Sequence, residues 1–298
     1  MFAEIASFLE KSRRRTFLVL VALIILDAFL FGVLGAEGGE NGGASVSFLD
    51  VGQGDASLIE LERGVQILID GGPPNGRLLA ALGEIMPPID RTIELVVLTH
   101  PELDHYGGFI DLLTRYDVGA FLETGVTKEV DAYSTLARIL EERGVRRITL
   151  RAGDRVRYAE NIVTVLSPDE ALAHAKEKND TGFVLAFESD PSAGGARFLF
   201  TADIGAEVER AVAKIIDVPF DVLKVSHHGS KFSSDAQFLA TVRPALAAIE
   251  VGKNSYGHPT KEALARLEAV GTKIYRTDRD GTITVRVENG RLRVFDER

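Results

Sequence analysis

The stretch "THPELDHYGG" (residues 99–108) sets two histidines and two carboxylates within six positions, directly after an apolar run. A continuous apolar run that ends in polar residues is typical of a strand buried on both faces. If the polar segment is extended, alternate residues share a side, so His100, Glu102 and Asp104 would converge while His105 points toward a second ion. The stretch therefore predicts a ligand-bearing loop at the end of a strand.

The same arrangement recurs along the chain, because five of the six histidines follow apolar runs and only His174 stands apart. The polar residues at these predicted strand ends are Asp50, Asp55, Asp70, His100, Glu102, Asp104, His105, Asp203, His227, His228 and His258. Histidine with carboxylates and no cysteine is the ligand set of a hydrolytic centre for Zn²⁺, Mn²⁺ or Fe. Two such ions about 3.5–4 Å apart can share a bridging carboxylate.

The composition of the chain excludes some kinds of site and substrate. The chain has 298 residues, of which 45% are hydrophobic and 26% are charged, and this is a globular composition. It has no cysteine, which excludes disulfides, cysteine-based zinc sites and cysteine nucleophiles. The formal net charge of −10 does not favour nucleic acid through general electrostatics. An anionic substrate would therefore need a local basic patch or a bound metal.

The N-terminal part predicts a membrane anchor. Residues 17–36 are apolar except for Asp27, and twenty residues of helix span about 30 Å. Basic residues precede this stretch and acidic residues follow it, which indicates a cytoplasmic N-terminus (1–16) and an extracytoplasmic remainder. The alternative is a cleaved signal sequence and a secreted protein. Residues 37–43 read as a flexible linker, and the main domain is expected over 44–298.

The main domain is expected to be strand-rich, with helices interspersed in both halves. Strands are predicted near 45–50, 56–62, 65–72, 93–100, 146–150, 162–166, 183–188, 197–202, 221–225, 245–250, 273–276, 281–287 and 291–295. Helices are predicted near 77–86, 107–115, 131–143, 206–216, 235–242 and 260–270. This order suggests an α/β fold in which two sheets pack face to face with helices outside.

Several segments resemble the metallo-β-lactamase superfamily and, within it, the hydrolase domains of the ComEC competence proteins, which form DNA-uptake channels. The matching segments are "LDVGQGDASLI" (49–59), "ILIDGG" (67–72), "LTHPELDHYGG" (98–108), "NDTGFVL" (179–185), "FLFTADIG" (198–205), "LKVSHHGSKFS" (223–233), "VGKNSYGHP" (251–259) and "YRTDRDGTI" (275–283). The resemblance implies a four-layer αβ/βα sandwich with the site at one edge of the two sheets. The multi-helix ComEC channel has no counterpart, so a stand-alone relative, with a separate DNA-uptake channel as partner, is expected.

The resemblance also implies a set of metal ligands. Asp104 and His105 would hold one ion, Asp203 would bridge, and His227 or His228 would complete that site, with His228 favoured. His100 would lead the other site, with Glu102 as a further ligand. The third histidine usual in the family has no match, since Asn179 and Asp180 stand in that stretch. An oxygen-rich site of this kind suits Mn²⁺ better than Zn²⁺.

Other residues are expected around the ions. Asp70 resembles a buried carboxylate that orients ligands, although a turn role before Gly71 explains it almost equally well. Asp55 is expected at the rim of the site. The metal ions would activate a water as nucleophile, and His258 would protonate the leaving oxygen, with a helix-start role as the alternative. Residues expected to contact substrate phosphate, or else to be solvated, are Asn179, Lys224, Lys231, Lys253 and Asn254.

The resulting expectation is a metal-dependent phosphodiesterase, most simply a nuclease that degrades DNA outside the membrane. One alternative is hydrolysis of another ester, such as a wall-polymer phosphodiester, a lactone or a β-lactam. The other alternative is a tethered scaffold or binding module that has lost the chemistry. The near-complete ligand set argues against the scaffold.

Overall fold

The computed structural model describes residues 43–175, 177–288 and 290–297, and residues 43 onward form one compact unit. The expected N-terminal segment, the expected anchor over 17–36 and the expected linker up to residue 42 lie outside the described residues. Among the helices of the described ranges, none is both long and apolar enough to cross a bilayer.

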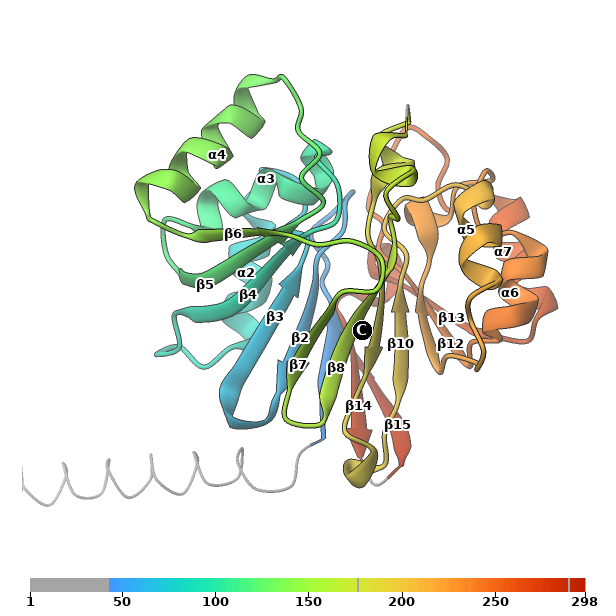
Figure 1. Ribbon diagram of the computed structural model, residues 1–298. Helices are drawn as coiled ribbons and strands as arrows, with labels where there is room; N and C mark the ends of the chain where they lie inside the picture. Colours follow the sequence, from blue (N-terminus) through green and yellow to red (C-terminus); the bar gives the residue numbers. More distant parts are fainter. Residues whose placement is uncertain (1–42, 176, 289, 298) are drawn as a thin grey trace, which may run out of the picture. The chain divides into compact units, whose positions relative to one another are not determined.

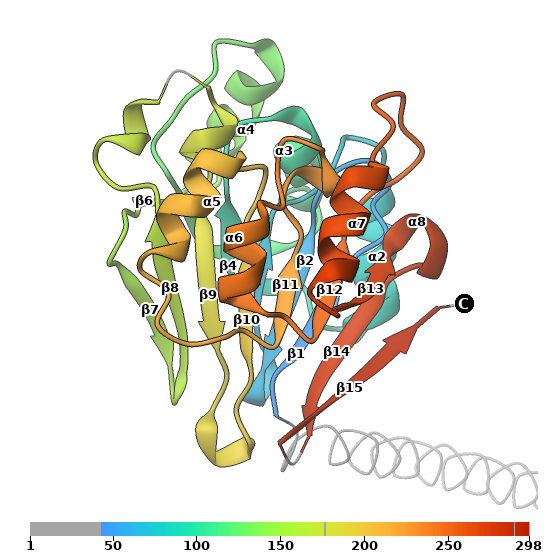
Figure 2. The ribbon, with the colours of Figure 1, turned by 90° about the vertical axis from the view of Figure 1, so that its right-hand side faces the viewer.

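Two sheets lie face to face, and helices cover the outer face of each (Figures 1 and 2). The first sheet has the strand order β15-β14-β1-β2-β3-β4-β5-β6, and the second has the order β13-β12-β11-β10-β9-β8-β7. The strands of the first sheet are β1 (Ser45–Phe48), β2 (Ser57–Leu61), β3 (Val65–Ile69), β4 (Thr92–Leu98), β5 (Asp117–Glu123), β6 (Arg146–Thr149), β14 (Ile283–Glu288) and β15 (Arg291–Asp296). Those of the second are β7 (Arg155–Tyr158), β8 (Asn161–Ser167), β9 (Val184–Glu188), β10 (Arg197–Phe200), β11 (Val222–Lys224), β12 (Leu246–Ile249) and β13 (Lys273–Arg276).

The helices divide between the two sheets, which confirms the predicted sandwich with helices outside. The helices on the first sheet are α2 (Arg77–Ile85), α3 (Leu103–Leu112) and α4 (Asp131–Glu142). Those on the second are α5 (Ala206–Ala213), α6 (Ala236–Val242) and α7 (Lys261–Ala269). A short helix, α8 (Thr277–Asp280), joins β13 to β14.

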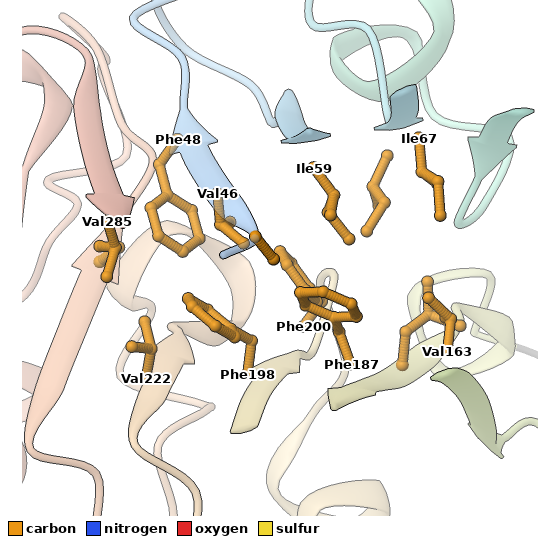
Figure 3. Close-up of a cluster of buried hydrophobic side chains, with 14 of the residues drawn as sticks. Val46, Phe48, Ile59, Ile67, Val163, Phe187, Phe198, Phe200, Val222 and Val285 are labelled. Carbon is orange, nitrogen blue, oxygen red and sulfur yellow. The ribbon is translucent and has the colours of Figure 1, made fainter. Parts of the chain in front are cut away.

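The central core lies between the sheets and is rich in phenylalanine (Figure 3). Phe48 from the first sheet faces Phe200 from the second, with ring centroids 6.1 Å apart. Phe187 and Phe198 pack side by side in the second sheet at 5.6 Å. Each such ring stabilises the fold by about 1.5–3 kcal/mol through burial, so the alternating apolar positions hold the sheets together.

The structure differs from the predicted elements in four places, one of which is the unexpected short helix α8. β5 and β7 were not expected, and α3 begins at Leu103 rather than near residue 107. The helix therefore starts inside the "THPELDHYGG" segment, and this changes the geometry of that segment. β6 and β7 each form one edge of their sheet, opposite β15 and β13, and they carry several arginines, which discourages pairing with another sheet.

The strand directions bring distant residues to one edge. β3, β4 and β5 are parallel to one another, and so are β10, β11, β12 and β13. Parallel strands end at the same edge of their sheet, where sites usually form. The polar residues that follow β3, β4, β10, β11 and β12 are therefore neighbours in space.

Candidate metal centre

Histidines and carboxylates that follow three strands, β4, β10 and β11, converge at this edge. The Oδ2 atom of Asp203 lies 3.5 Å from the Nε2 atom of His105 and 3.5 Å from that of His228. The Oδ2 atom of Asp104 lies 3.4 Å from the same His228 nitrogen. The rings of His100 and His105 are 4.1 Å apart. The structure thus brings together most of the residues that the sequence singled out as ligands.

Among the described residues, four groups of three side chains have the geometry of a metal site, and two of these groups consist of residues expected as ligands. His100, His105 and Asp203 form one, and Asp104, His105 and His228 form the other, with ligand atoms within 4.8 Å of one another in each group. His227 is adjacent, with its Nε2 atom 3.8 Å from Asp203, but its side chain is about one-third exposed. His228 is buried inside the cluster, in the group with Asp104 and His105.

The helical start of α3 explains why the alternation expected for residues 100–104 is not observed. Leu103 onward is helical, so successive side chains turn by about 100° rather than alternating, and both Asp104 and His105 point into the cluster. Glu102 precedes the helix and points away, where its Oε2 atom pairs with the Lys128 ammonium at 2.5 Å. The structure therefore leaves Glu102 outside the ligand groups.

Buried ligand atoms without partners fit a bound cation. Within the described part of the chain, four cluster atoms are buried and accept or donate no hydrogen bond. They are the Nε2 atoms of His100, His105 and His228 and the Oδ1 atom of Asp203. Leaving such groups unpaired costs free energy, and a divalent ion that accepts imidazole nitrogen and carboxylate oxygen would remove that cost. The residues present therefore fit a metal centre.

The electrostatics of the cluster also favour a cation. Burial opposes ionisation of Asp203, yet His228 and His105 hold its pKa well below the usual range. Burial alone would lower the pKa of His228, but Asp203 and Asp55 raise it to about 10. His100 behaves differently, since burial and the neighbouring His105 lower its pKa to about 3. Beside Asp203, the negative charge of the carboxylates thus outweighs the effect of burial, so a positive charge is stabilised there. His100 stays neutral, as an imidazole that binds a metal must.

The loop that carries His227 and His228 has an unusual backbone. Both residues have positive φ angles, +50° and +53°, a region that costs energy for side chains other than glycine. Glu209 of α5 is buried beneath this loop and accepts hydrogen bonds from the Ser226 hydroxyl (2.6 Å) and from the Ser234 (2.8 Å) backbone N–H. This carboxylate holds both ends of the loop, so α5 fixes the position of the two imidazoles.

Asp70 lies behind His105. Its Oδ2 atom accepts from the His105 Nδ1 atom (2.8 Å) and from the Thr99 hydroxyl (2.6 Å), and its Oδ1 atom accepts from the Thr99 backbone N–H (2.8 Å). A hydrogen on Nδ1 leaves the Nε2 lone pair of His105 free to face the cluster. The carboxylate therefore fixes both the tautomer and the orientation of this ring.

Replacing Asp70 with asparagine is expected to weaken metal affinity by about 10- to 100-fold, because the ring of His105 loses its charged partner. Competition with a chromophoric chelator would measure the affinity for Zn²⁺ and Mn²⁺. Asp50→Asn is the matched control, since Asp50 also follows a strand but pairs with Arg77 at the surface. Equal affinities for the Asp70 and Asp50 variants would rule out this role.

Asp55 and Lys224 lie beneath the cluster, in a position that differs from the expectation. Asp55 is 2% exposed, makes a short contact to the Lys224 ammonium, and has an oxygen 3.1 Å from the His228 Nδ1 atom. Lys224 is equally buried and also donates to the Ala202 carbonyl (3.1 Å). Asp55 is therefore not at the rim, and Lys224 cannot reach a substrate phosphate. The pair instead supports the histidines from below.

Glu250 completes this buried layer and was not singled out in the sequence. Its carboxylate accepts from the Ala56 backbone N–H (3.2 Å) and the Ser57 hydroxyl (3.1 Å), while its own carbonyl accepts from His228 Nδ1 (2.8 Å). Burial and the nearby Asp55 raise the pKa of Glu250 to about 8. A carboxylate that ends an apolar strand was the available signal, and it is the same signal that pointed to Asp70.

The rim of the site is formed by the loops after β11 and β12. The ring of His258 lies 5.5 Å from that of His227, and its buried Nδ1 atom has no partner among the described residues. Lys231 and Lys253 are exposed on these loops. Asn254 is occupied within its own loop, since its amide donates to two carbonyls and its oxygen accepts from two backbone N–H groups. It is therefore not free to bind substrate.

The stretch that replaces the usual third histidine packs beside His100. Asn179 is partly exposed, and its carbonyl accepts from the Gly182 N–H (2.9 Å). A Cβ atom added at Gly182 would lie 3.7 Å from the His100 Nδ1 atom. Asp180 turns away and accepts from the Gly205 N–H (3.1 Å). The backbone of this segment thus packs against His100 on this side, and the segment supplies no further imidazole.

A four-layer sandwich with a histidine–carboxylate cluster at one edge defines the class of metallo-β-lactamase folds, whose members are generally metal-dependent hydrolases. The chain belongs to this superfamily, because the family described as "Beta-lactamase superfamily domain" matches residues 66–250, more than half of the chain.

Among curated proteins, two relatives are a ComE operon protein and a competence protein. The chain is 31% identical over 284 residues to ComE operon protein 3 of Bacillus subtilis, covering 88% of this chain and 34% of the relative. It is 29% identical over 269 residues to Competence protein ComA of Neisseria gonorrhoeae, covering 85% of this chain and 34% of the relative. The chain thus spans about a third of the length of these relatives.

Solved structures share the fold at low identity. The metallo-β-lactamase fold protein YhfI from Bacillus subtilis aligns with a TM-score of 0.55 and 11% identity, over 81% of this chain and 99% of YhfI. CmlA, a diiron β-hydroxylase from Streptomyces venezuelae, aligns with a TM-score of 0.50 and 15% identity, over 82% of this chain and 54% of CmlA. At such identities the likeness concerns the fold alone.

Proposed function

We propose that the chain is a metal-dependent phosphodiesterase, acting as a nuclease on DNA outside the membrane. The observation that carries the proposal is the group of buried, unpartnered ligand atoms on His100, His105, His228 and Asp203 at the edge of the sandwich. Kinship with proteins named for competence supports DNA as the substrate.

The proposed ligands form two sets, one for each ion, and Asp203 would belong to both. Asp104, His105 and His228 would hold one divalent ion, and His100 would hold a second with Asp203 shared between them. Such ions, Zn²⁺ or Mn²⁺, would supply Lewis acidity and an activated water for hydrolysis. The predominance of carboxylates around these ligands supports cation binding. Asp70 orients the ring of His105, and the Glu250 carbonyl orients the ring of His228.

The rim residues have complementary proposed roles. His258 lies next to His227 and would donate a hydrogen bond and then a proton to the leaving oxygen. Lys253 and Lys231 are exposed on the flanking loops and would neutralise phosphate charge. These local cations would allow a chain of net charge −10 to bind a polyanion.

For the location, we propose that residues 17–36 anchor the chain with the N-terminus in the cytoplasm and the domain outside, the alternative being secretion after cleavage. The apolar stretch flanked by basic residues on its N-terminal side supports this orientation. A separate DNA-uptake channel would be the partner, a proposal that rests on the names of the relatives.

The test uses the full chain, purified without chelator and supplied with Mn²⁺ or Zn²⁺. Linear DNA and a small phosphodiester, bis(p-nitrophenyl) phosphate, are offered to the wild type and to the double variant Asp104→Ala, His105→Ala. The wild type is expected to cut both substrates and the double variant neither. His174→Ala is the matched control, because this histidine is exposed and far from the cluster in the sequence.

The other outcomes separate the alternatives. Cleavage of the small ester alone would replace DNA with another phosphodiester as the substrate. Two bound ions without cleavage of either substrate would exclude a phosphodiesterase. A chain that binds no metal would overturn the hydrolase proposal and leave a scaffold.

A further inference from the structure

Two aromatic side chains stand out in solvent beside the metal centre. Phe232 is 70% exposed and Tyr256 is 73% exposed, whereas most large apolar side chains of the described residues are buried. Phe232 follows the His227–His228 loop, and Tyr256 stands two positions before His258. Single exposed apolar residues are common on any surface. Two exposed rings on the two loops that form the rim of one site instead indicate a binding surface.

Ring contacts connect Tyr256 to the cluster. The centroid of its ring lies 5.8 Å from that of His258, and the two ring planes are tilted by 31°, so the rings are neighbours. The ring of His258 lies 5.5 Å from that of His227, whose Nε2 atom is 3.8 Å from Asp203. A row of three rings therefore leads from open solvent to the proposed ligands.

Phe232 is held on the other loop by its backbone. Its carbonyl accepts from the Ala206 N–H (3.0 Å), and its N–H donates to the Ser230 hydroxyl (3.3 Å). The next residue, Ser233, donates its hydroxyl to the Ile204 carbonyl (2.9 Å), directly after Asp203 in the chain. The backbone is thus fixed close to the metal centre while the phenyl ring remains in water.

An exposed lysine lies near each of these two aromatic residues in the chain. The Lys231 ammonium lies 5.0 Å from the centroid of the Phe232 ring, and Lys253 is exposed three residues before Tyr256. Neither lysine pairs with a carboxylate within the described ranges, although the chain is acidic overall. Exposed aromatic rings that alternate with cations are the surface that single-stranded nucleic acids use, because bases stack on the rings while cations follow the backbone.

We propose that Phe232 and Tyr256 stack on unpaired bases on either side of a phosphodiester at the metal centre, so that the site prefers single-stranded nucleic acid. A duplex would not use these rings, because its base faces are covered by neighbouring bases. A small lactone or β-lactam would not need two rings on separate loops. The inference deepens the proposed nuclease function and rests on it.

The test measures binding and cleavage separately. Binding of a fluorescent single-stranded oligonucleotide, and of its duplex, is followed by anisotropy with the full chain in an Asp203→Asn background, where cleavage does not interfere. Phe232→Ala and Tyr256→Ala are each expected to weaken single-strand binding by about tenfold, since stacking contributes about 1–3 kcal/mol per base. Phe232→Tyr and Tyr256→Phe keep a ring and are expected to keep the affinity.

Phe295→Ala is the matched control, because Phe295 is an exposed aromatic on β15. In the metal-loaded full chain, the ratio of single-strand cleavage to hydrolysis of bis(p-nitrophenyl) phosphate is expected to fall at least about tenfold in the double variant Phe232→Ala, Tyr256→Ala.

The outcomes distinguish this inference from the proposed function. Single-strand affinity that is unchanged by removing both rings, or equal affinity for duplex, would overturn the stacking role even if phosphodiesters are cut. Ring-dependent binding of single strands with no hydrolysis of any phosphodiester would support the stacking surface and overturn the nuclease.

Discussion

Replacing Asp203 with asparagine is expected to reduce phosphodiester hydrolysis by about 100- to 1,000-fold. Among the described residues, its carboxylate is the one group that lies within 4 Å of His105, His227 and His228 at once, and its second oxygen is buried with no hydrogen-bond partner there. An amide keeps the shape but removes the negative charge, so the cluster loses the group proposed to be shared by two ions. Steady-state cleavage and metal content would be measured on the same preparation.

Asp217→Asn is the control for Asp203→Asn, since Asp217 is exposed and lies outside the cluster. The melting temperature of the metal-stripped protein would report folding separately from metal binding. Wild-type activity and metal content in Asp203→Asn would contradict the shared-ligand role.

Replacing Lys224 with methionine is expected to lower the free energy of unfolding by about 3–5 kcal/mol. Lys224 and Asp55 are both almost fully buried and in direct contact, and Asp203 is 4.0 Å from the same ammonium. Removing the cation leaves these carboxylates in a site with little water, where an unpaired charge is costly. Chemical denaturation of the metal-stripped protein would measure the loss.

A double variant separates charge from packing. Asp55→Asn combined with Lys224→Met removes both charges and is expected to recover part of the stability that Lys224→Met loses. Lys214→Met is the matched control, because Lys214 is an exposed lysine at the end of α5. A Lys224→Met protein as stable as Lys214→Met would show that the buried pair does not support the cluster.

Most of the fold was predictable because its signals are local. Apolar runs that end in polar residues predict the strands that precede Asp70, His100 and Asp203. Helical periodicity predicts the six helices that cover the sheets. β5 was missed because Gly119 weakens its strand pattern, yet this glycine is needed where a Cβ atom would meet the Glu94 carbonyl at 2.6 Å. β7 was missed because its arginines are typical of a solvated loop, although they suit an exposed edge strand.

The members of the site were also predictable, but their directions were not. Residue type and strand-end position indicate which side chains gather, whereas burial depends on packing between the two sheets. Lys224 shows the difference, since a lysine in a motif loop is expected in solvent and this one is held inside by Asp55. Glu102 shows the converse, because the early start of α3 turns it outward to Lys128.

The most direct measurement is the metal content of the full chain by elemental mass spectrometry, after loading with Mn²⁺ or Zn²⁺ and removal of free ions. The wild type and the His174→Ala control are predicted to retain about two ions per chain, and His105→Ala to retain fewer. A wild type that retains no metal, or a His105→Ala variant that loads as well as the wild type, would contradict a metal centre at the edge of the sandwich.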